Sequence, residues 1–132
     1  MIKHPSRFEV ITLFVDDIAD ARRFYKDVLD PKVVYEDDVS SVLKFGELVI
    51  NLLQVTEAPV LVEPLMVATP RNGVAVLLTI KVEDVDSTCA ELTRRGVSLL
   101  NGPVDRPWGR RTAAFADPSG HVWEIAQELP TA

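Results

Sequence analysis

Val15-Asp16-Asp17-Ile18-Ala19-Asp20 and Val82-Glu83-Asp84-Val85-Asp86-Ser87 are two versions of one pattern, and this repeat decides the fold. Each stretch follows an apolar run that alternates as a strand does, and each opens a segment with helical periodicity. The offset between them is 67 residues, and the same offset aligns Leu13 with Ile80. The sequence therefore predicts two copies of one β-α-β-β-β unit. Because neither half-sheet is large enough to close a core alone, we expect the units to pack together and form a pocket at their seam.

Length and composition are typical of one soluble globular domain. The chain has 132 residues, of which 47% are hydrophobic and 26% are charged. Its net charge of −6 argues against nucleic acid or an anionic membrane as a partner, since both bind clustered Lys and Arg. The single cysteine, Cys89, leaves no intrachain disulfide and indicates a reducing compartment. We recognise no signal segment and no apolar run of membrane-spanning length, so we expect a cytoplasmic protein.

The first unit, at about residues 6–54, is predicted to contain a strand, a helix and three further strands. Asp17 is placed to accept hydrogen bonds from the first N–H groups of the helix, and Asp30-Pro31 ends it. Residues 55–73 contain three prolines and no clear period, and we interpret them as a connector. β-Branched and aromatic residues predict the strands at residues 8–15, 33–35, 41–45 and 48–53.

The second unit, at about residues 74–128, repeats this order. Asp84 is expected to cap its helix, and Gly96 to end that helix in a left-handed conformation. The residues from Asp117 to Gly120 are those that a type I turn prefers. Both units and the connector are expected to form one domain over residues 1–132. We expect strands at residues 74–82, 97–100, 112–116 and 121–127, and a loop at 101–109.

Three motifs follow one another along the chain. They are the Asp16-Asp17 helix start with Phe24-Tyr25, the loop Arg106-Pro107-Trp108-Gly109, and Asp117-Pro118-Ser119-Gly120-His121-Val122-Trp123-Glu124. In this order they resemble the glyoxalase/bleomycin-resistance/extradiol dioxygenase superfamily, also called vicinal oxygen chelate proteins, over nearly the whole chain. The resemblance implies an α+β fold in which two βαβββ modules curl into a half-open barrel. It also implies a homodimer.

The resemblance also points to four positions where a metal ligand would stand. Superfamily members with metal chemistry place His or Glu ligands at matching points of the two modules, which here are Val10, Asn51, Leu77 and Glu124. Val10 and Leu77 have no donor atom, an amide is a weak ligand, and one carboxylate does not hold a divalent ion. We therefore expect no metal and no other cofactor.

Strand alternation predicts which side chains line the barrel interior. Ile11, Leu13 and Val15 are expected to pack against the helices. A cavity that is mostly apolar with a few polar groups is typical of a small-molecule site. The residues predicted to line it are Val10, Thr12, Phe14, Asn51, Leu77, Thr79 and Glu124.

Four residues are candidates for contacting a ligand through charge or stacking. Glu124 in an apolar pocket would have a raised pKa and serve as a general base or bind a cation, or else it is a structural carboxylate paired with arginine. Trp108 is placed either to stack on a flat ligand or to pack in the core or an interface. Arg110 and Arg111 alternate, so only one faces the cavity, where its partner is a substrate carboxylate or Glu124.

We predict metal-independent binding of a small hydrophobic or aromatic molecule, as in the drug-sequestering antibiotic resistance proteins of the superfamily that the chain resembles. The expected partners are that ligand and a second copy of the chain. Three alternatives stay open. They are a glyoxalase- or dioxygenase-type metalloenzyme with ligands at other positions, a metal-free isomerase with Glu124 as its base, and an interaction module whose pocket is filled by side chains.

Overall fold

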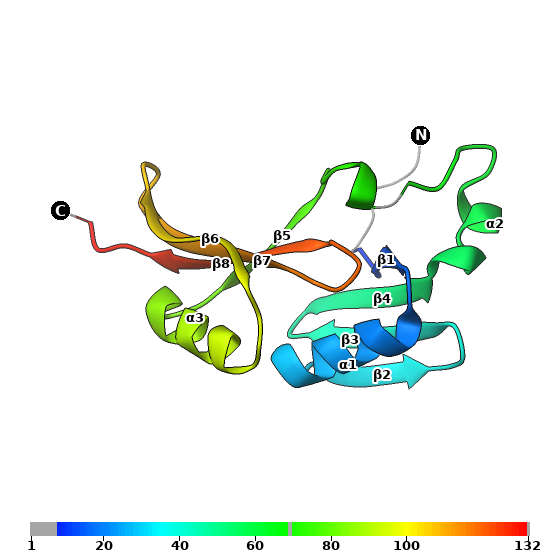
Figure 1. Cartoon of the computed structure of the whole chain (residues 1–132), viewed down its shortest axis with the longest axis horizontal. Coiled ribbons are helices and arrows are strands. Elements are labelled where there is room, and N and C mark those ends of the chain that lie inside the picture. Colours follow the sequence, from blue (N-terminus) through cyan, green and yellow to red (C-terminus); the bar gives the residue numbers. More distant parts are fainter. Residues whose placement is uncertain (1–7, 69, 132) are drawn as a thin grey trace.

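The computed structural model describes residues 8–68 and 70–131 and has an α+β fold made of two βαβββ modules, as predicted (Figure 1). The predicted start of the first module near residue 6 lies outside the described residues. Module 1 contains β1 (Ile11–Val15), α1 (Ile18–Val28), β2 (Lys32–Glu36), β3 (Ser40–Phe45) and β4 (Leu48–Gln54). Module 2 contains β5 (Leu77–Lys81), α3 (Val85–Arg94), β6 (Leu99–Arg106), β7 (Arg110–Ala116) and β8 (Val122–Glu128). Between them lie the short helices η1 (Val55–Glu57), α2 (Pro59–Val62) and η2 (Pro70–Asn72).

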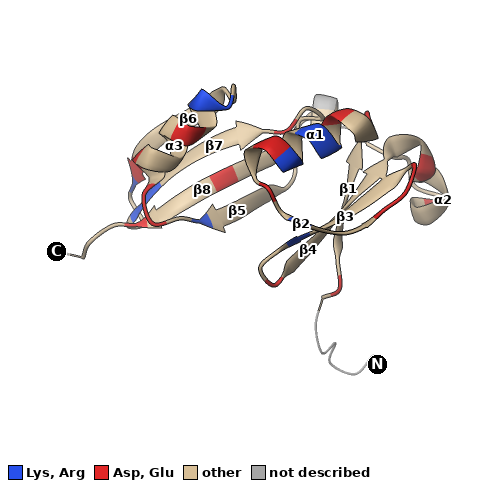
Figure 2. Ribbon diagram, turned by 90° about the horizontal axis from the view of Figure 1, so that it is seen from below, with Lys and Arg blue, Asp and Glu red and all other residues tan. Residues whose placement is uncertain are grey.

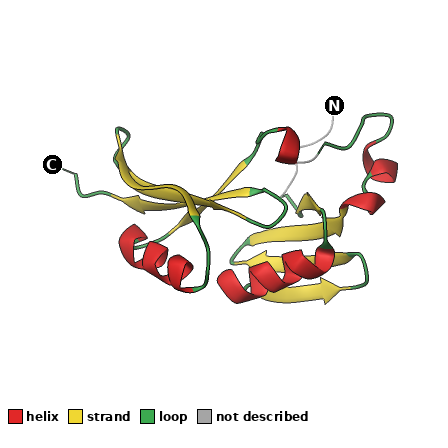
Figure 3. Ribbon diagram, in the orientation of Figure 1, coloured by secondary structure: helices red, strands yellow, loops and turns green. Residues whose placement is uncertain are grey.

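The strands form two four-stranded sheets with the orders β1-β4-β3-β2 and β5-β8-β7-β6. In each sheet the first strand pairs in parallel with the last, and the other pairs are antiparallel. Helix α1 covers one face of the first sheet and α3 one face of the second (Figures 1 and 3). We call the opposite faces, which carry Thr12 and Asn51 in module 1 and Thr79 and Glu124 in module 2, the open faces. Over the described residues the sheets share no ladder and form no closed barrel.

Both long helices begin at an aspartate that caps free N–H groups, as predicted. The Asp17 carboxylate accepts hydrogen bonds from the backbone nitrogens of Ala19 (2.9 Å) and Asp20 (3.2 Å), and Asp84 accepts one from Asp86 (3.1 Å). These bonds satisfy donors that have no intrahelical partner, and a cap of this kind contributes about 1 kcal/mol. Within the described part of the chain, no helix has the length and apolar character needed to cross a membrane.

A glutamine at the end of each module's last strand provides a second cap that the sequence did not reveal. Gln54 Oε1 accepts a hydrogen bond from the Ile18 nitrogen at 2.9 Å, and Gln127 Oε1 accepts one from the Val85 nitrogen at the same distance. Each bond ties the first turn of a helix to the parallel strand pair beneath it. The internal repeat therefore extends from the pattern of apolar residues to individual hydrogen bonds.

A single hydrophobic core spans both modules. Leu13 and Val15 of β1 are buried, as are Trp123 and Ile125 of β8, in agreement with the predicted alternation. Ile11, which was expected in the same layer, begins β1 and is 36% exposed. The most deeply buried large side chains of this core include Trp123, Tyr25, Phe115, Ile50, Leu52, Ile125, Val15 and Val85.

A buried polar network joins the two modules under α1. The Tyr25 hydroxyl donates to Asp117 Oδ2 at 2.6 Å and accepts from Trp123 Nε1 at 2.9 Å. Asp117 Oδ1 also accepts from the backbone nitrogens of Ser119 and His121, which forms the predicted turn. Burial, together with the neighbouring Asp117 carboxylate, raises the pKa of Tyr25 far above its ordinary value. Tyr25 therefore stays protonated and holds one module to the other.

Further contacts cross the seam at the same turn. A ring nitrogen of His121 lies 2.7 Å from the Phe14 carbonyl oxygen, and the Asp16 nitrogen donates to Ser119 Oγ at 3.0 Å. Because these residues lie more than 100 positions apart in sequence, the turn between β7 and β8 fixes how module 2 sits against β1. His121 is thus used in holding the modules together.

The prediction of a loop at residues 101–109 is wrong for most of that segment, because β6 continues to Arg106. The ladder between β6 and β7 is irregular around Asn101 and Val104, and Gly102 has a positive φ of 85°. A Cβ at Gly102 would lie 2.4 Å from the Thr112 carbonyl oxygen, so only glycine fits this close approach. Gly102-Pro103 therefore marks a bulge within a strand.

Candidate functional site

The internal repeat places two polar pairs at equivalent points of the two open faces. Thr12 of β1 lies beside Asn51 of β4 in the parallel ladder, and Thr79 of β5 lies beside Glu124 of β8 in the same way. In each strand the neighbouring residues face the core, which leaves these four side chains on the open side. All four were predicted to line the cavity, and Asn51 and Glu124 are the points at which the modules differ most in chemistry.

Asn51 carries a buried oxygen that lacks a hydrogen-bond partner. Among the described residues, its Oδ1 is the buried side-chain polar atom for which no partner is found. Buried polar groups are almost always satisfied, so an exception of this kind calls for an explanation. Asn51 also lines a pocket of about 640 Å³ on the open face of module 1, together with Phe8, Glu9, Val10, Val34, Val42, Lys44, Glu47 and Val49.

Glu124 lies on the open face of module 2 and is only partly buried. Its Oε1 accepts a hydrogen bond from Thr79 Oγ1 at 3.1 Å. Leu77, one step along β5 from Leu78, is 52% exposed. Within one chain this face is therefore open to solvent, which differs from the enclosed apolar pocket that was expected around the carboxylate.

The two candidate arginines point to opposite sides of β7. Ala114 pairs with Glu124, so Arg110, four residues earlier in the strand, shares the open face. The Arg110 guanidinium lies 2.7 Å from Glu128. Arg111 lies on the helix side and pairs with Asp86 of α3 and with Asp105, both at 2.9 Å. Arg111 thus has a structural role within module 2.

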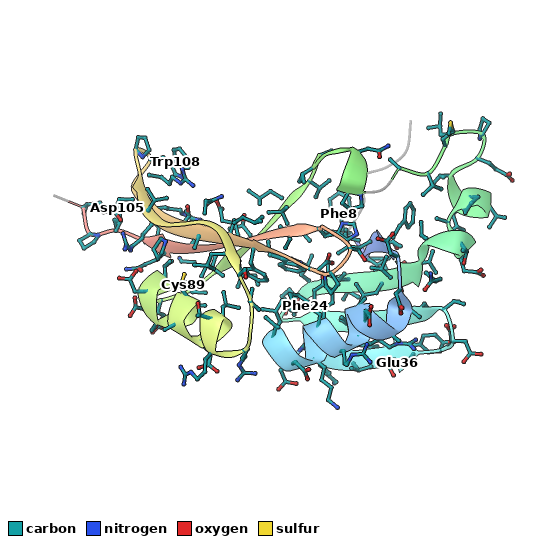
Figure 4. All side chains as sticks on the ribbon, in the orientation of Figure 1. Phe8, Phe24, Glu36, Cys89, Asp105 and Trp108 are labelled. Atoms are coloured by element: carbon teal, nitrogen blue, oxygen red, sulfur yellow. The ribbon has the colours of Figure 1, made fainter. Side chains whose placement is uncertain are left out.

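Arg106 stands in the Arg-Pro-Trp-Gly motif, and the basic group that it forms with Arg110 and Arg111 in the sequence could hold a small anion, but it was not among the predicted ligand-binding residues. Its Nε donates to Thr112 Oγ1 at 2.9 Å and its Nη2 to Asn101 Oδ1 at 3.3 Å. Its guanidinium carbon lies 6.0 Å from the ring centroid of Trp108, within the range of a cation–π contact. Trp108 is 67% exposed at the tip of the β6–β7 hairpin, on the side away from α3 (Figure 4). Trp108 therefore does not pack in the core of the chain.

A second cavity of about 530 Å³ lies between α1 and the edge strand β2. Acidic and basic residues alternate along this part of α1 (Figure 2). Its two arginines are already engaged, because Arg22 donates to Ser41 Oγ and to the Ser40 carbonyl oxygen, and Arg23 pairs with Asp20. With both arginines bonded within the chain, this groove is a weaker candidate than the pocket beside Asn51.

The residues at the superfamily's metal positions do not fit a divalent metal. Val10 and Leu77 supply no donor atom, which leaves the Asn51 amide and the Glu124 carboxylate. Over the described residues no group of three or more His, Cys, Asp or Glu side chains is placed to hold an ion. Cys89 is buried in the core, and this burial raises the pKa of its thiol.

The two paired βαβββ modules define a fold class, and the sequence comparison identifies the superfamily to which the chain belongs. The profile of the Glyoxalase/Bleomycin resistance protein/Dioxygenase superfamily matches residues 7–125, and the chain belongs to this superfamily. A relative is the uncharacterized protein YraH of Bacillus subtilis, which is 35% identical over 123 residues, covering 90% of this chain and 96% of YraH.

Solved structures show the same fold. A glyoxalase/bleomycin resistance protein/dioxygenase from Nocardioides has a TM-score of 0.84 at 19% identity, covering 100% of this chain and 89% of its own. TnmS3, an antibiotic binding protein from Streptomyces sp. CB03234, has a TM-score of 0.71 at 25% identity, covering 95% of this chain and 99% of TnmS3. The chain is thus similar to proteins of this superfamily over nearly its full length.

Proposed function

We propose that this protein binds a small, partly hydrophobic or aromatic organic molecule on its open faces, without a metal ion. The observation that carries the proposal is the buried, unpartnered Oδ1 of Asn51 beside the pocket of module 1. Leaving such a group without a partner costs about 1–3 kcal/mol, and turning the Asn51 amide so that its oxygen meets a donor on a bound ligand would remove that penalty.

The composition of the pocket agrees with an organic ligand. Its volume of about 640 Å³ falls within the usual range for small-molecule sites, roughly 300–1,000 Å³. Val10, Val34, Val42 and Val49 supply most of the apolar lining, and Asn51 is a polar group that can fix the orientation of the ligand. A site of this kind needs no chemistry to protect a cell, because sequestering a toxic compound is sufficient.

The similarity to TnmS3 supports the same proposal. TnmS3 is described as an antibiotic binding protein, and this chain matches it over almost the whole length of both proteins. By this analogy, the proposed ligand of the present protein is an antibiotic or a similar organic compound. A role in antibiotic resistance by sequestration follows from that analogy and is part of the proposal.

The proposed binding unit is a homodimer. Large apolar side chains outside the pocket of module 1 are exposed, including Leu48, Val74, Val76 and Leu77. Monomeric proteins seldom expose so many large apolar side chains together, so the proposal is that a second copy of the chain covers them. Sedimentation of the purified protein at micromolar concentration is expected to give twice the mass of the chain.

The test uses a substitution that should spare the fold. Asn51→Leu removes the unpartnered amide but keeps its approximate size, so the protein is expected to stay folded while binding weakens about tenfold or more. Asn72→Leu, at an exposed position in η2, is the matched control. The probes are an anthracycline, a tetracycline and a fluoroquinolone, titrated by calorimetry into protein treated with a chelator. If none of them binds the wild-type protein, or if both variants bind like the wild type, the proposal is wrong.

Superfamily membership raises one further candidate, in which Glu124 acts as a base in a metal-free reaction. The observation in its favour is that Glu124 lies on an open face with its position fixed by Thr79. This candidate function requires that the protein turn over a carbonyl substrate. Glu124→Gln should abolish that turnover, and the control Glu128→Gln should preserve it. Binding without turnover would leave sequestration as the function.

A further inference from the structure

The open face of module 2 carries a guanidinium that no carboxylate of the described residues neutralises. Arg106, at the end of β6, is held by two neutral acceptors, the hydroxyl of Thr112 and the amide oxygen of Asn101. Every other arginine whose side chain the structure describes has a carboxylate oxygen within 3.9 Å. Among these described arginines, only Arg106 is held in position by hydrogen bonds without a carboxylate that neutralises its charge.

Two of the nearby carboxylates form ion pairs with other arginines. Asp105, adjacent in sequence, pairs with Arg111 on the helix side of the sheet, and Glu128 pairs with Arg110. Glu124 accepts its hydrogen bond from Thr79. A chain with a net charge of −6 has enough carboxylates to neutralise every arginine, so an unneutralised one on an open face is a specific feature of the site.

The hydrogen bonds of Arg106 leave one nitrogen of its guanidinium group available to a ligand. Nε and Nη2 donate to the protein, whereas Nη1 makes no hydrogen bond to any described residue. The guanidinium also lies over the ring of Trp108, which remains 67% exposed. An arginine oriented in this way recognises planar oxyanions, and an exposed indole beside it offers a surface for a flat ring.

We propose that Arg106 and Trp108 together recognise an oxyanion attached to a flat ring, so that the ligand is an aromatic carboxylate or an aromatic phosphate. Neither residue lines the pocket beside Asn51, so this is a second site, on module 2, that goes beyond the proposed function. Because the negative net charge repels anions at long range, Arg106 must supply the preference locally.

The experiment compares three probes with the same ring system: 2-naphthoate, 2-naphthyl phosphate and the neutral 2-naphthamide. Calorimetry on the wild-type protein is expected to show at least tenfold tighter binding of one anionic probe than of the amide. Its affinity should fall as NaCl is raised from 50 to 500 mM, while that of the amide should not. Whichever anion binds more tightly identifies the oxyanion as a carboxylate or a phosphate.

Variants assign the preference to Arg106. Arg106→Gln should abolish the difference in affinity between the anionic and neutral probes. Arg106→Lys should restore part of that difference, because lysine keeps the positive charge but not the planar guanidinium group. Arg94→Gln, which removes an exposed arginine of α3 paired with Glu91, should keep the full difference. Circular dichroism shows whether each variant is folded.

Equal affinity of the wild type for all three probes would overturn the inference and leave the proposed function standing. An anion preference that survives in folded Arg106→Gln would also overturn it. Absence of binding by every naphthalene probe counts against the inference, whereas the antibiotic titrations described above decide the proposed function separately.

Discussion

Tyr25→Phe is expected to lower the free energy of unfolding by about 3–5 kcal/mol. The hydroxyl donates to the buried Asp117 carboxylate at 2.6 Å, and a hydrogen bond to a charged acceptor contributes about 1.5–3 kcal/mol. It also accepts from Trp123 Nε1, and leaving that buried N–H without a partner costs a further 1–3 kcal/mol or so. Since domains unfold with about 5–15 kcal/mol, this loss is a large part of the total.

Urea unfolding followed by Trp fluorescence measures the effect. Tyr35→Phe is the matched control, because the Tyr35 hydroxyl donates to Asp37 at 2.9 Å on the surface, and its loss should cost less than about 1 kcal/mol. If Tyr25→Phe destabilises the protein no more than Tyr35→Phe does, the buried network does not hold the modules together as described.

Three further predictions follow from the same structure. Gly102→Ala should destabilise the protein by about 2–4 kcal/mol in urea unfolding, because alanine would have to adopt a positive φ and would clash with the Thr112 carbonyl oxygen. The control Gly46→Ala, which also has a positive φ but open space around it, should cost only about 1–2 kcal/mol. Equal losses in the two variants would contradict the bulge. Above about pH 10 the unfolded chain loses the Tyr25 proton while the folded chain keeps it. The free energy of unfolding should therefore fall with pH more steeply in the wild type than in Tyr25→Phe, by about 1.4 kcal/mol per pH unit. Parallel plots of unfolding free energy against pH for the two proteins would refute this. Elemental analysis of protein purified without a metal-affinity tag should find no stoichiometric zinc, nickel, manganese or iron, and a stoichiometric metal would show that the donor positions are misassigned.

The fold followed from sequence wherever one residue's environment is set by its neighbours in the chain. Asp17 and Asp84 cap the helices, and the period of two placed Trp123 and Ile125 in the core. Strand β6 was missed in part because Gly102 allows a bulge, so a turn-like residue pair sits inside a ladder. Local composition does not distinguish a bulge from a loop when the compensating contact comes from another strand.

The site was less accessible to sequence reasoning because its properties depend on distant partners. The repeat located Asn51 and Glu124, but the unpartnered oxygen of Asn51 and the Thr79 contact of Glu124 depend on parallel ladders between remote strands. Arg106 and Arg110 look alike in the sequence. They differ because Glu128 neutralises Arg110 and only neutral groups bind Arg106, and strand register decides this.

The most direct test of small-molecule binding on the open faces is a ¹H–¹⁵N NMR titration of metal-free protein with a planar ligand found by calorimetry. The account predicts that the largest shift occurs at the side-chain amide of Asn51, which lines the pocket of module 1, while the indole N–H of buried Trp123 moves little. Shifts confined to the groove between α1 and β2, or a spectrum unchanged by the ligand, would contradict it.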